Sequence, residues 1–371
     1  MTAASGCWLL ASGWGSGSRK PTAGSQEVEA QGMFVLGIES SCDETAAAVV
    51  EDGRTVRSNI VASQHDLHRP FGGVVPEVAA RAHAERVTAL VDEALAAAGL
   101  APSRLGGIAV VVRPGLVGAL LVGLAAAKGF ALAWDVPLVG VDHLLAHVYA
   151  SRLAGLDEYP HLSLIVSGGH TCLYRVDGPE AVRTLGQTAD DAAGEAFDKA
   201  AKMLGLGFPG GPALAQCAAN GNPRAVSFPR AGPNQKPGDT PDFSFSGLKT
   251  AVYYHLRERT GGTGRPLADA ERADVAASFQ EALCEILVEK TLAASRATGL
   301  SRVAVGGGVA CNRRLRELFT ERAGEGRVFF PPPALCADNA AMAAGLGWHR
   351  LARGERDPWD LEVDPTPKRA G

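Results

Sequence analysis

The sequence predicts an α/β protein built from two duplicated lobes. From Phe34 onward, short apolar runs alternate with helical patterns, and this alternation is typical of the α/β class. A unit of strand, polar turn and strand occurs twice, and the Asp-Gly pair that closes the second unit, at Gly178, lies 125 residues after the pair at Gly53. Repetition at a domain-sized interval indicates two similar lobes. We therefore expect the polar turns that head the two lobes to face each other across a cleft.

The first copy begins directly after Met33. Its pattern predicts a strand at residues 34–38, a polar turn at 39–45 and a second strand at 46–50. A helix at 77–99, a strand at 108–112 and a helix at 118–134 are then predicted from the spacing of their apolar residues.

The second copy repeats this order and extends it. Strands are predicted at residues 162–166 and 172–176, around a polar turn at 167–171. The Pro-rich stretch at 228–241 predicts a long surface loop. The elements expected after it are a helix near 274–298, a strand at 302–305, a Gly-rich turn and a helix at 313–323.

The predicted organisation has four parts. Residues 1–32 are rich in Gly and Ser and form a flexible N-terminal extension, with Met33 as an alternative start. The first lobe spans 33–141 and the second 142–337, and the C-terminal helix at 338–352 packs back on the first lobe. Residues 353–371 are polar and contain prolines, so we expect this tail to fray.

Composition excludes several classes of protein. The chain of 371 residues is 46% hydrophobic and 20% charged, which is too apolar for a disordered polyelectrolyte. No apolar run approaches the roughly 18 to 20 residues that span a bilayer, so we expect no membrane contact and a cytoplasmic location. The net charge of −4 provides no basic field, so any RNA contact must come from a local patch or a partner. Seven scattered cysteines without a CxxC pair favour reduced thiols.

The first candidate for chemistry is the pair His143 and His147. Asp142 precedes them as a candidate N-cap, so a helix is expected to begin here. A spacing of four residues places both imidazoles on one helix face, about one turn apart, as a metal site requires. No Glu follows His143, so this is not the HExxH motif of zinc proteases. Without a third ligand, the spacing fits two ordinary surface histidines equally well.

Asp338 is the candidate third ligand. It follows a Pro-rich stretch and stands at the start of a final Ala-rich helix. Taken alone, it would be interpreted as the N-cap of that helix. Two histidines and one carboxylate with open coordination positions suit Fe(II), with Zn(II) as the alternative.

A Gly-rich turn at 306–312 lies between a predicted strand and a predicted helix. Backbone amides and the helix N-terminus would favour an anion there, whereas Asn312 alone reads as a helix cap. The turn matches neither the Rossmann nor the P-loop pattern.

Three acids, Asp191, Glu195 and Asp198, have the spacing of one helix face and precede a Pro-Gly-Gly-Pro turn at 209–212. Pairing with lysines four residues later would make them an ordinary solvated face, but the rigid turn suits a ligand. The alternation of Phe243 and Phe245 is typical of a buried core, and base stacking is the less favoured interpretation.

Taken together, these motifs closely resemble those of the tRNA N6-adenosine threonylcarbamoyltransferase family, bacterial type, formerly named the O-sialoglycoprotein endopeptidase family. The resemblance covers about residues 33–350. Its motifs, in order, are GIESSCDET (37–45), GGVVPE (72–77), PGLVG (114–118), the HxxxH helix, SGGHT (167–171), DDAAGEAFDK (190–199), PGGP (209–212), DFSFSGLKT (242–250), GGGVACN (306–312) and CADNAAMAA (336–344).

The resemblance implies the two-lobed fold of actin, sugar kinases and the heat-shock seventy chaperones. It implies transfer of the threonylcarbamoyl group from threonylcarbamoyl-adenylate to N6 of the adenosine 3′ of the anticodon in ANN-decoding tRNAs, with release of AMP. The implied partners are tRNA, a paralogous partner subunit and a small ATPase.

The resemblance also assigns site residues. It implies that His143, His147 and Asp338 bind one divalent metal, and that Asp43 and Glu44 lie in a loop facing the substrate, where one of them takes the proton of the attacking amine. The residues implied to line the threonylcarbamoyl-adenylate site are Ile165, Val166, Ser167, Gly168, Gly169, Asp198, Gly211 and Asn312.

The chain departs from the family pattern at two positions. Arg113 stands where relatives carry Gly before Pro114, and Ala215 stands where many relatives carry an acid. Two other functions are considered: a metal-dependent peptidase and a non-enzymatic subunit of a tRNA-modification complex. The missing Glu after His143 argues against the first, and the complete set of three ligands argues against the second.

Overall fold

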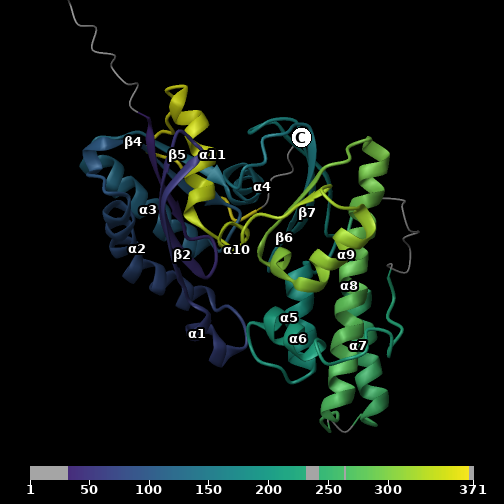
Figure 1. The fold of residues 1–371 in the computed structure, drawn as a ribbon. Coiled ribbons are helices and arrows are strands. Elements are labelled where there is room, and N and C mark those ends of the chain that lie inside the picture. Colours follow the sequence, from purple (N-terminus) through teal and green to yellow (C-terminus); the bar gives the residue numbers. More distant parts are fainter. Residues whose placement is uncertain (1–31, 231–241, 263–264, 367–371) are drawn as a thin grey trace, which may run out of the picture. The chain divides into compact units, whose positions relative to one another are not determined.

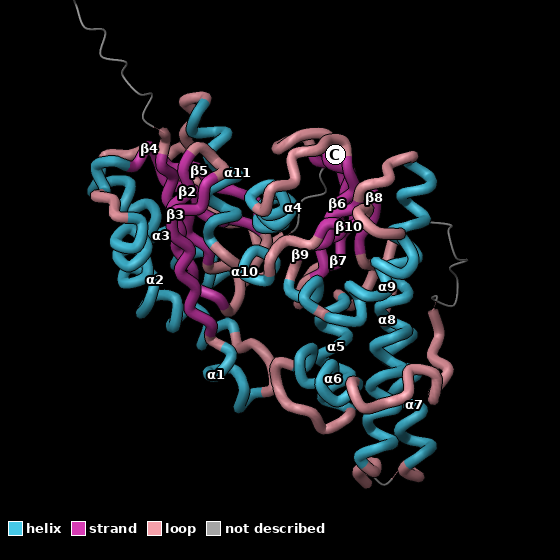
Figure 2. The backbone as a smooth tube through the Cα atoms, in the orientation of Figure 1, coloured by secondary structure: helices cyan, strands magenta, loops and turns pink. Residues whose placement is uncertain are grey.

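The computed structural model describes residues 32–230, 242–262 and 265–366, and contains two five-stranded sheets (Figure 1, Figure 2). The strand orders are β3-β2-β1-β4-β5 and β8-β7-β6-β9-β10. In each sheet the first strand pairs antiparallel with the next strand along the chain and parallel with the fourth. The two sheets therefore have the same topology, and the predicted α/β duplication is confirmed.

The element bounds agree closely with the sequence pattern. The strands are β1 (Phe34–Glu39), β2 (Glu44–Glu51), β3 (Thr55–Ser63), β4 (Leu105–Arg113), β5 (Leu138–Asp142), β6 (His161–Val166), β7 (Thr171–Val176), β8 (Val182–Gln187), β9 (Val303–Gly306) and β10 (Val328–Phe329). The helices are α1 (His65–His68), α2 (Pro76–Ala98), α3 (Val117–Trp134), α4 (His143–Leu153), α5 (Ala193–Met203), α6 (Gly210–Ala218), α7 (Ser246–Arg259), α8 (Asp269–Thr298), α9 (Arg313–Ala323), α10 (Pro333–Cys336) and α11 (Ala340–Ala352), with 3₁₀ turns η1 (Arg69–Phe71), η2 (Pro102–Arg104) and η3 (Gly308–Cys311).

Helices cover both faces of the first sheet. Successive side chains of a strand point to opposite faces, so Leu36 packs with α2 and α3 while Val35 packs with α4 and α11. Helix α11 lies against strands β1, β2, β4 and β5, although it is the last helix of the chain (Figure 1).

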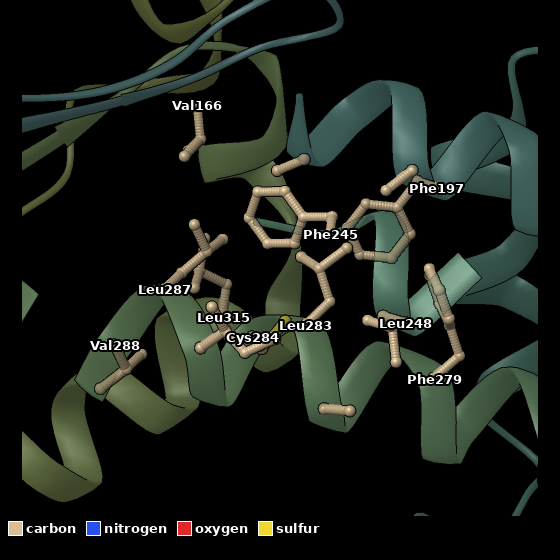
Figure 3. Packing of buried hydrophobic residues seen from close by; sticks show 14 of the residues in the cluster. Val166, Phe197, Phe245, Leu248, Phe279, Leu283, Cys284, Leu287, Val288 and Leu315 are labelled. Atoms are coloured by element: carbon tan, nitrogen blue, oxygen red, sulfur yellow. The ribbon is translucent and has the colours of Figure 1, made fainter. Parts of the chain in front are cut away.

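The second sheet carries its main core on one face. There, side chains from α5, α7, α8 and α9 form one apolar cluster, and Val166 at the end of β6 lies at its upper edge in Figure 3. Phe197, Phe245 and Phe279 are fully buried in this cluster. The interpretation of the Phe alternation as core is therefore confirmed.

Helix α4 packs against both sheets. Its residue Ala146 belongs to the apolar cluster of the first sheet, while Leu144 and Val148 pack with strands β6 and β7 of the second. These contacts use two sides of the helix, and the spacing of His143 and His147 places both imidazoles on a third.

Helix α3 corrects one expectation from the sequence. Among the described residues it is the one helix long and apolar enough to span a membrane by length and composition, so the expectation that no apolar run reaches this length is wrong. Ala119, Leu120 and Leu124 are nevertheless buried within the lobe, where α3 packs against α2 and β4. A core helix satisfies the same length test, so α3 is weak evidence for a membrane.

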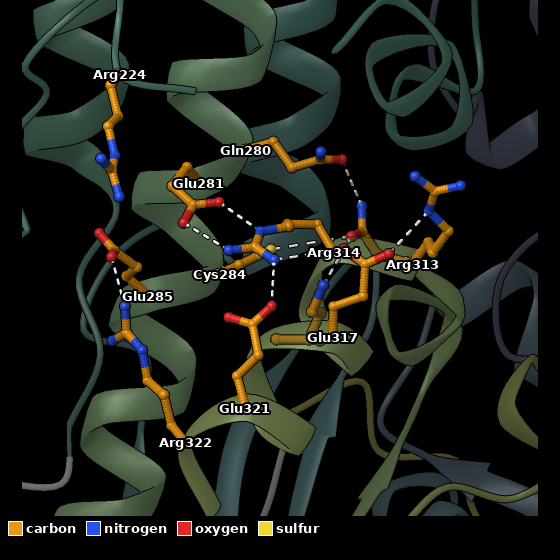
Figure 4. A network of polar contacts seen from close by, with 12 residues as sticks. Arg224, Gln280, Glu281, Cys284, Glu285, Arg313, Arg314, Glu317, Glu321 and Arg322 are labelled. Atoms are coloured by element: carbon orange, nitrogen blue, oxygen red, sulfur yellow. Dashed lines mark hydrogen bonds and ion pairs between the residues drawn. The ribbon is translucent and has the colours of Figure 1, made fainter. Parts of the chain in front are cut away.

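Helix α9 is tied to α8 by charged side chains (Figure 4). The guanidinium of Arg314 donates to Glu281 at 2.7 Å and to Glu321 at 2.9 Å, and Arg322 pairs with Glu289 at 2.8 Å. The network fixes α9 and therefore the Gly-rich turn that precedes it.

The segment after α11 does not fray as expected, at least as far as residue 366. The Asp357 carboxylate accepts hydrogen bonds from Gly140 N (2.7 Å) and from Arg350, and Lys128 Nζ donates to Leu361 O (2.7 Å). These contacts hold the segment against β5 and α3. The N-terminal extension up to residue 31 and residues 231–241 of the Pro-rich segment lie outside the described residues.

Candidate metal centre and adjoining loops

His143, His147 and Asp338 come together in the structure. Asp142 caps α4, because its Oδ1 accepts from Leu144 N at 2.9 Å, and this confirms the predicted helix start. Asp338 Oδ1 lies 3.0 Å from His147 Nε2 and 3.7 Å from His143 Nε2. One potential ligand atom from each residue lies within 4.8 Å of the others, so the three donors could hold one cation.

Asp338 is free to face the histidines because its neighbour caps α11. Asn339 Oδ1 accepts from Met342 N at 3.1 Å, so Asn339 is the N-cap. The interpretation of Asp338 as the cap is therefore wrong, and its carboxylate points instead to α4.

Behind His143 lies a buried acid that sequence analysis missed. Glu39 ends β1 with no exposed surface, and its Oε2 accepts from His143 Nδ1 at 2.9 Å. A carboxylate can only accept, so Nδ1 carries the proton and Nε2 is the nitrogen left to bind a cation. This carboxylate–histidine pairing is typical of metal sites. The available signal was an acid at the last position of an otherwise apolar strand.

The positive charge of the histidines and the negative charge of the carboxylates in this cluster stabilise each other. Burial opposes protonation of His143, but the carboxylates of Glu39 and Asp338 outweigh it and raise the pKa to about 9. Burial works against the Asp338 carboxylate, yet His143 and His147 hold its pKa well below the usual range. The site therefore stabilises positive charge next to Asp338, as a cation-binding centre must.

The turn that heads the second sheet lies beside this centre. The His170 ring centroid is 6.4 Å from that of His143, and burial followed by the two neighbouring imidazoles lowers the pKa of His170 to about 4. The turn is tight, because Ser167 N donates to His170 O at 2.8 Å. Gly168 and Gly169 are exposed, with open space where a Cβ would lie.

The first residues of α5 pack directly against this turn. Gly194 N donates to Ser167 O at 3.1 Å, and a Cβ on Gly194 would lie only 2.6 Å from that oxygen. Ile165 and Val166, which precede the turn, are fully buried in the apolar clusters of the second sheet. Their side chains support the turn from the core and do not line an exposed surface.

Asp198 and Gly211 also lie close together. Asp198 Oδ1 accepts from Gly210 N at 2.8 Å, and the Gly211 amide also bonds this carboxylate. Burial raises the pKa of Asp198 and the two amides oppose that shift. The acid therefore ties α5 to the start of α6.

The predicted three-acid helix face is partly wrong. Helix α5 begins at Ala193, so Asp191 lies in the preceding turn, where its carboxylate pairs with Lys199 (2.6 Å) and Lys249 (2.8 Å). Glu195 pairs with Lys199 at 2.7 Å as the helical spacing predicts.

Asn312 caps α9, as its position after the Gly-rich turn predicts. Its Oδ1 accepts from Leu315 N at 3.1 Å and its Nδ2 donates to Gln280 Oε1 at 2.9 Å. Gly307 has φ of +87°, and a Cβ there would collide with the backbone of Val166. The Gly-rich turn is thereby packed directly against the end of β6.

Asp43 and Glu44 stand where the first sheet turns from β1 to β2. Burial raises the pKa of Glu44 to about 7, and a hydrogen bond from His65 opposes the shift. The turn is fixed by His83, whose Nε2 donates to Cys42 O at 3.0 Å. Asp43 is close enough to Asp198 of the second lobe to affect its pKa, so the acid pair lies toward that lobe.

The two departures from the family pattern lie in regular elements. Arg113 ends β4 opposite Asp142, after an irregularity in the β4–β5 register. Ala215 lies within α6.

The twin sheets define a protein of the two-lobed class that includes actin-like ATPases and sugar kinases. Component A of (R)-2-hydroxyglutaryl-CoA dehydratase from Acidaminococcus fermentans matches with a TM-score of 0.50 and 14% identity, covering 86% of this chain and 99% of that one. HypF from T. kodakarensis matches with a TM-score of 0.55 and 17% identity, covering 86% of this chain and 48% of that one. At these identities the likeness concerns the fold alone.

Sequence comparison is more specific. The family model of TsaD, tRNA N6-adenosine threonylcarbamoyltransferase, matches residues 55–345. Proteins of that name from Syntrophotalea carbinolica and Anaeromyxobacter dehalogenans are 54% identical over 333 residues and 53% identical over 336 residues. The matches cover 89% and 90% of this chain and 95% and 98% of the relatives. The chain belongs to the tRNA N6-adenosine threonylcarbamoyltransferase family, a family of transferases, and the resemblance drawn from the motifs is confirmed.

Proposed function

We propose that this chain transfers the threonylcarbamoyl group of threonylcarbamoyl-adenylate to N6 of the adenosine 3′ of the anticodon in ANN-decoding tRNAs, in the cytoplasm, and releases AMP. The observation that carries the proposal is the convergence of His143, His147 and Asp338 beside the turn at 167–170, in a member of the threonylcarbamoyltransferase family.

We propose that the two imidazoles and the carboxylate hold one divalent cation. The donor set favours Fe(II), with Zn(II) as the alternative. When bound, such an ion polarises the carbamoyl oxygen or steadies the departing phosphate. Glu39 supports this role by holding His143 in the tautomer that presents Nε2.

The chain's own groups then divide the remaining work. The amides of Gly168 and Gly169 stabilise negative charge that develops on the carbamoyl oxygen. Asp198, Gly211 and the Gly-rich turn before Asn312 hold the adenylate in place. As the bond from N6 to the carbamoyl carbon forms and the bond from that carbon to the phosphate oxygen breaks, the Glu44 carboxylate takes the amine proton. The Glu44 pKa of about 7 suits this task near neutral pH.

The alternatives are less favoured. A zinc peptidase of the HExxH type carries Glu after its first histidine, whereas Leu144 stands there. A non-enzymatic subunit would have no need of the converged ligands with a buried carboxylate behind them.

We also propose that a paralogous subunit and a small ATPase assist tRNA binding. The net charge of −4 gives the isolated chain little attraction for RNA. Helix α3 exposes Val117, Leu121 and Leu132, whose exposed fractions of 49%, 51% and 72% suit a protein partner. Tight, salt-insensitive tRNA binding by the isolated chain would contradict this part of the proposal.

Reconstitution tests the reaction. A tRNA transcript, synthesised threonylcarbamoyl-adenylate, the candidate partner subunits and this chain are incubated with Fe(II) or Zn(II), and the nucleosides are analysed by mass spectrometry. We expect threonylcarbamoyl-adenosine and AMP in equal amounts. Absence of the modified nucleoside under all these conditions would refute the proposed function.

A further inference from the structure

His65, a residue to which sequence analysis gave no role, completes the acid pair. It is the first residue of α1, and its Nε2 lies 3.2 Å from Glu44 Oε1 and 3.6 Å from Asp43 Oδ2. The two acids are largely buried: 12% of the Asp43 side chain and 15% of the Glu44 side chain are exposed, whereas the His65 side chain is 43% exposed. Carboxylates can only accept, so His65 Nε2 is the donor in this contact.

The backbone holds His65 and the acids in register. Gln64 N, next to His65, donates to Asp43 O at 3.0 Å. The Gln64 side chain is buried and contacts His68 and Ala79 O. The short helix α1 is thus anchored to the same turn that carries the acids, so the His65 ring does not depend on a long flexible loop for its position.

The other side of the ring faces the second lobe. The His65 and Phe208 ring centroids are 6.4 Å apart and the planes are nearly perpendicular, at 89°. Phe208 directly precedes the turn whose Gly210 amide is held by Asp198. His65 therefore contacts both the acids of the first lobe and the wall of the proposed adenylate site.

We propose that His65 is a positioning residue for transfer: its ring N–H keeps the Glu44 carboxylate ionised and directed at the reacting amine. The inference rests on the proposed function, in which Glu44 takes the N6 proton. It assigns His65 no contact with the substrate.

The electrostatics give the inference a measurable sign. The hydrogen bond from His65 opposes the rise in Glu44 pKa that burial causes, and the partnership with Glu44 raises the pKa of His65 against its own burial. The other charged groups that influence the two residues are Asp43, Asp66, Asp198 and Asp338. Without His65, the Glu44 pKa rises further, so protonated and inactive Glu44 persists to higher pH.

The test compares pH–rate profiles of metal-loaded complexes containing the wild-type chain, His65→Phe or His65→Gln. Phe at position 65 keeps a ring against Phe208 but removes the hydrogen-bond donor to Glu44. Gln at position 65 provides a neutral hydrogen-bond donor in its place. We expect the acid limb of kcat to move up by about 0.5 to 1 pH unit in His65→Phe, by less in His65→Gln, and not at all in the control His255→Phe. Near pH 9 the His65→Phe rate returns to within about threefold of wild type. A His65→Phe profile that superimposes on the wild-type profile overturns the inference.

An activity-independent readout separates this inference from the proposed function. In NMR titrations the His65 ring should have a raised pKa, and Glu44→Gln should lower it. An unchanged His65 titration in Glu44→Gln overturns the inference even if transfer is observed. Failure of the wild-type complex to modify tRNA refutes the proposed function instead. The NMR titration then still decides whether His65 and Glu44 interact.

Discussion

The turns that head the two sheets share a backbone plan but differ in chemistry. The β1–β2 turn carries a buried acid at Glu39 and the acid pair Asp43 and Glu44. The corresponding β6–β7 turn carries Gly168 and Gly169, which leave backbone amides exposed. In the function proposed above, this difference divides the work between the two copies. The first copy would provide carboxylates that orient a ligand and accept a proton, and the second would provide amides that stabilise negative charge.

Helix α4 joins the two copies, so its histidines should be the most sensitive point of the comparison. We expect His143→Ala to reduce transfer by at least about 100-fold and also to lower the melting temperature, because it removes a proposed metal ligand and leaves the buried Glu39 carboxylate without its partner. His255→Ala on α7 is the matched control. Full transfer by a His143→Ala protein free of metal would show that the site is misassigned.

The role of Glu39, at the end of β1 in the first lobe, can be tested without changing the three proposed metal ligands. Glu39→Gln keeps an acceptor for His143 Nδ1 but removes the negative charge. We expect metal affinity to fall by about 10- to 100-fold in competition with a chelating indicator. Unchanged affinity would mean that Glu39 is only a structural partner of His143.

The second-lobe turn depends on backbone clearance. In Gly194→Ala the new Cβ meets Ser167 O at 2.6 Å, so we expect a loss of about 1–3 kcal/mol in unfolding free energy and weaker transfer. Gly129→Ala in α3 is the control, because nothing lies within 4 Å of its added Cβ. It should stabilise the protein by about 0.5–1 kcal/mol, as measured by urea unfolding. Equal effects of the two changes would contradict the proposed close contact.

The smallest expected effect concerns how helices are held on the second lobe. Arg314 is 27% exposed and pairs with Glu281 and Glu321, whereas Arg313 is 88% exposed. We expect Arg314→Met to cost about 1 kcal/mol at low salt and less at high salt, and Arg313→Met to stay within about 0.5 kcal/mol of wild type. A salt-independent loss in Arg314→Met would indicate lost packing instead of lost ion pairs.

Much of the fold could be predicted because its signals are local. Apolar runs around 34–38 and 162–166 and the helical pattern at 313–323 coincide with β1, β6 and α9. The four edge strands, β3, β5, β8 and β10, were missed, since a strand that completes a sheet edge needs little pattern of its own. The tail at 353–366 was wrongly expected to fray, because its anchors, Gly140 and Lys128, are distant in the chain.

The candidate site was predictable only in part. The spacing of His143 and His147 is visible in the sequence, but two neighbouring residues, Asp338 and Asn339, could each have capped α11. The choice between them depends on how α11 packs on the first sheet. Glu39 lies within the GIESSCDET motif and His65 lies in none of the family motifs, but no sequence signal gave either residue a role. Their roles follow from contacts with His143 and Glu44.

By itself, the sequence determined the duplicated strand–turn–strand unit and the pairing of two imidazoles on one helix turn, because these follow from short apolar runs and from periodicities of two and about 3.6 residues. Only the tertiary structure decided that Asp338 meets His147, from which it is separated by 191 positions in the chain, and that Glu39 stands behind His143. Such contacts depend on the way α4 and α11 pack against a common sheet, and no short-range pattern records that packing.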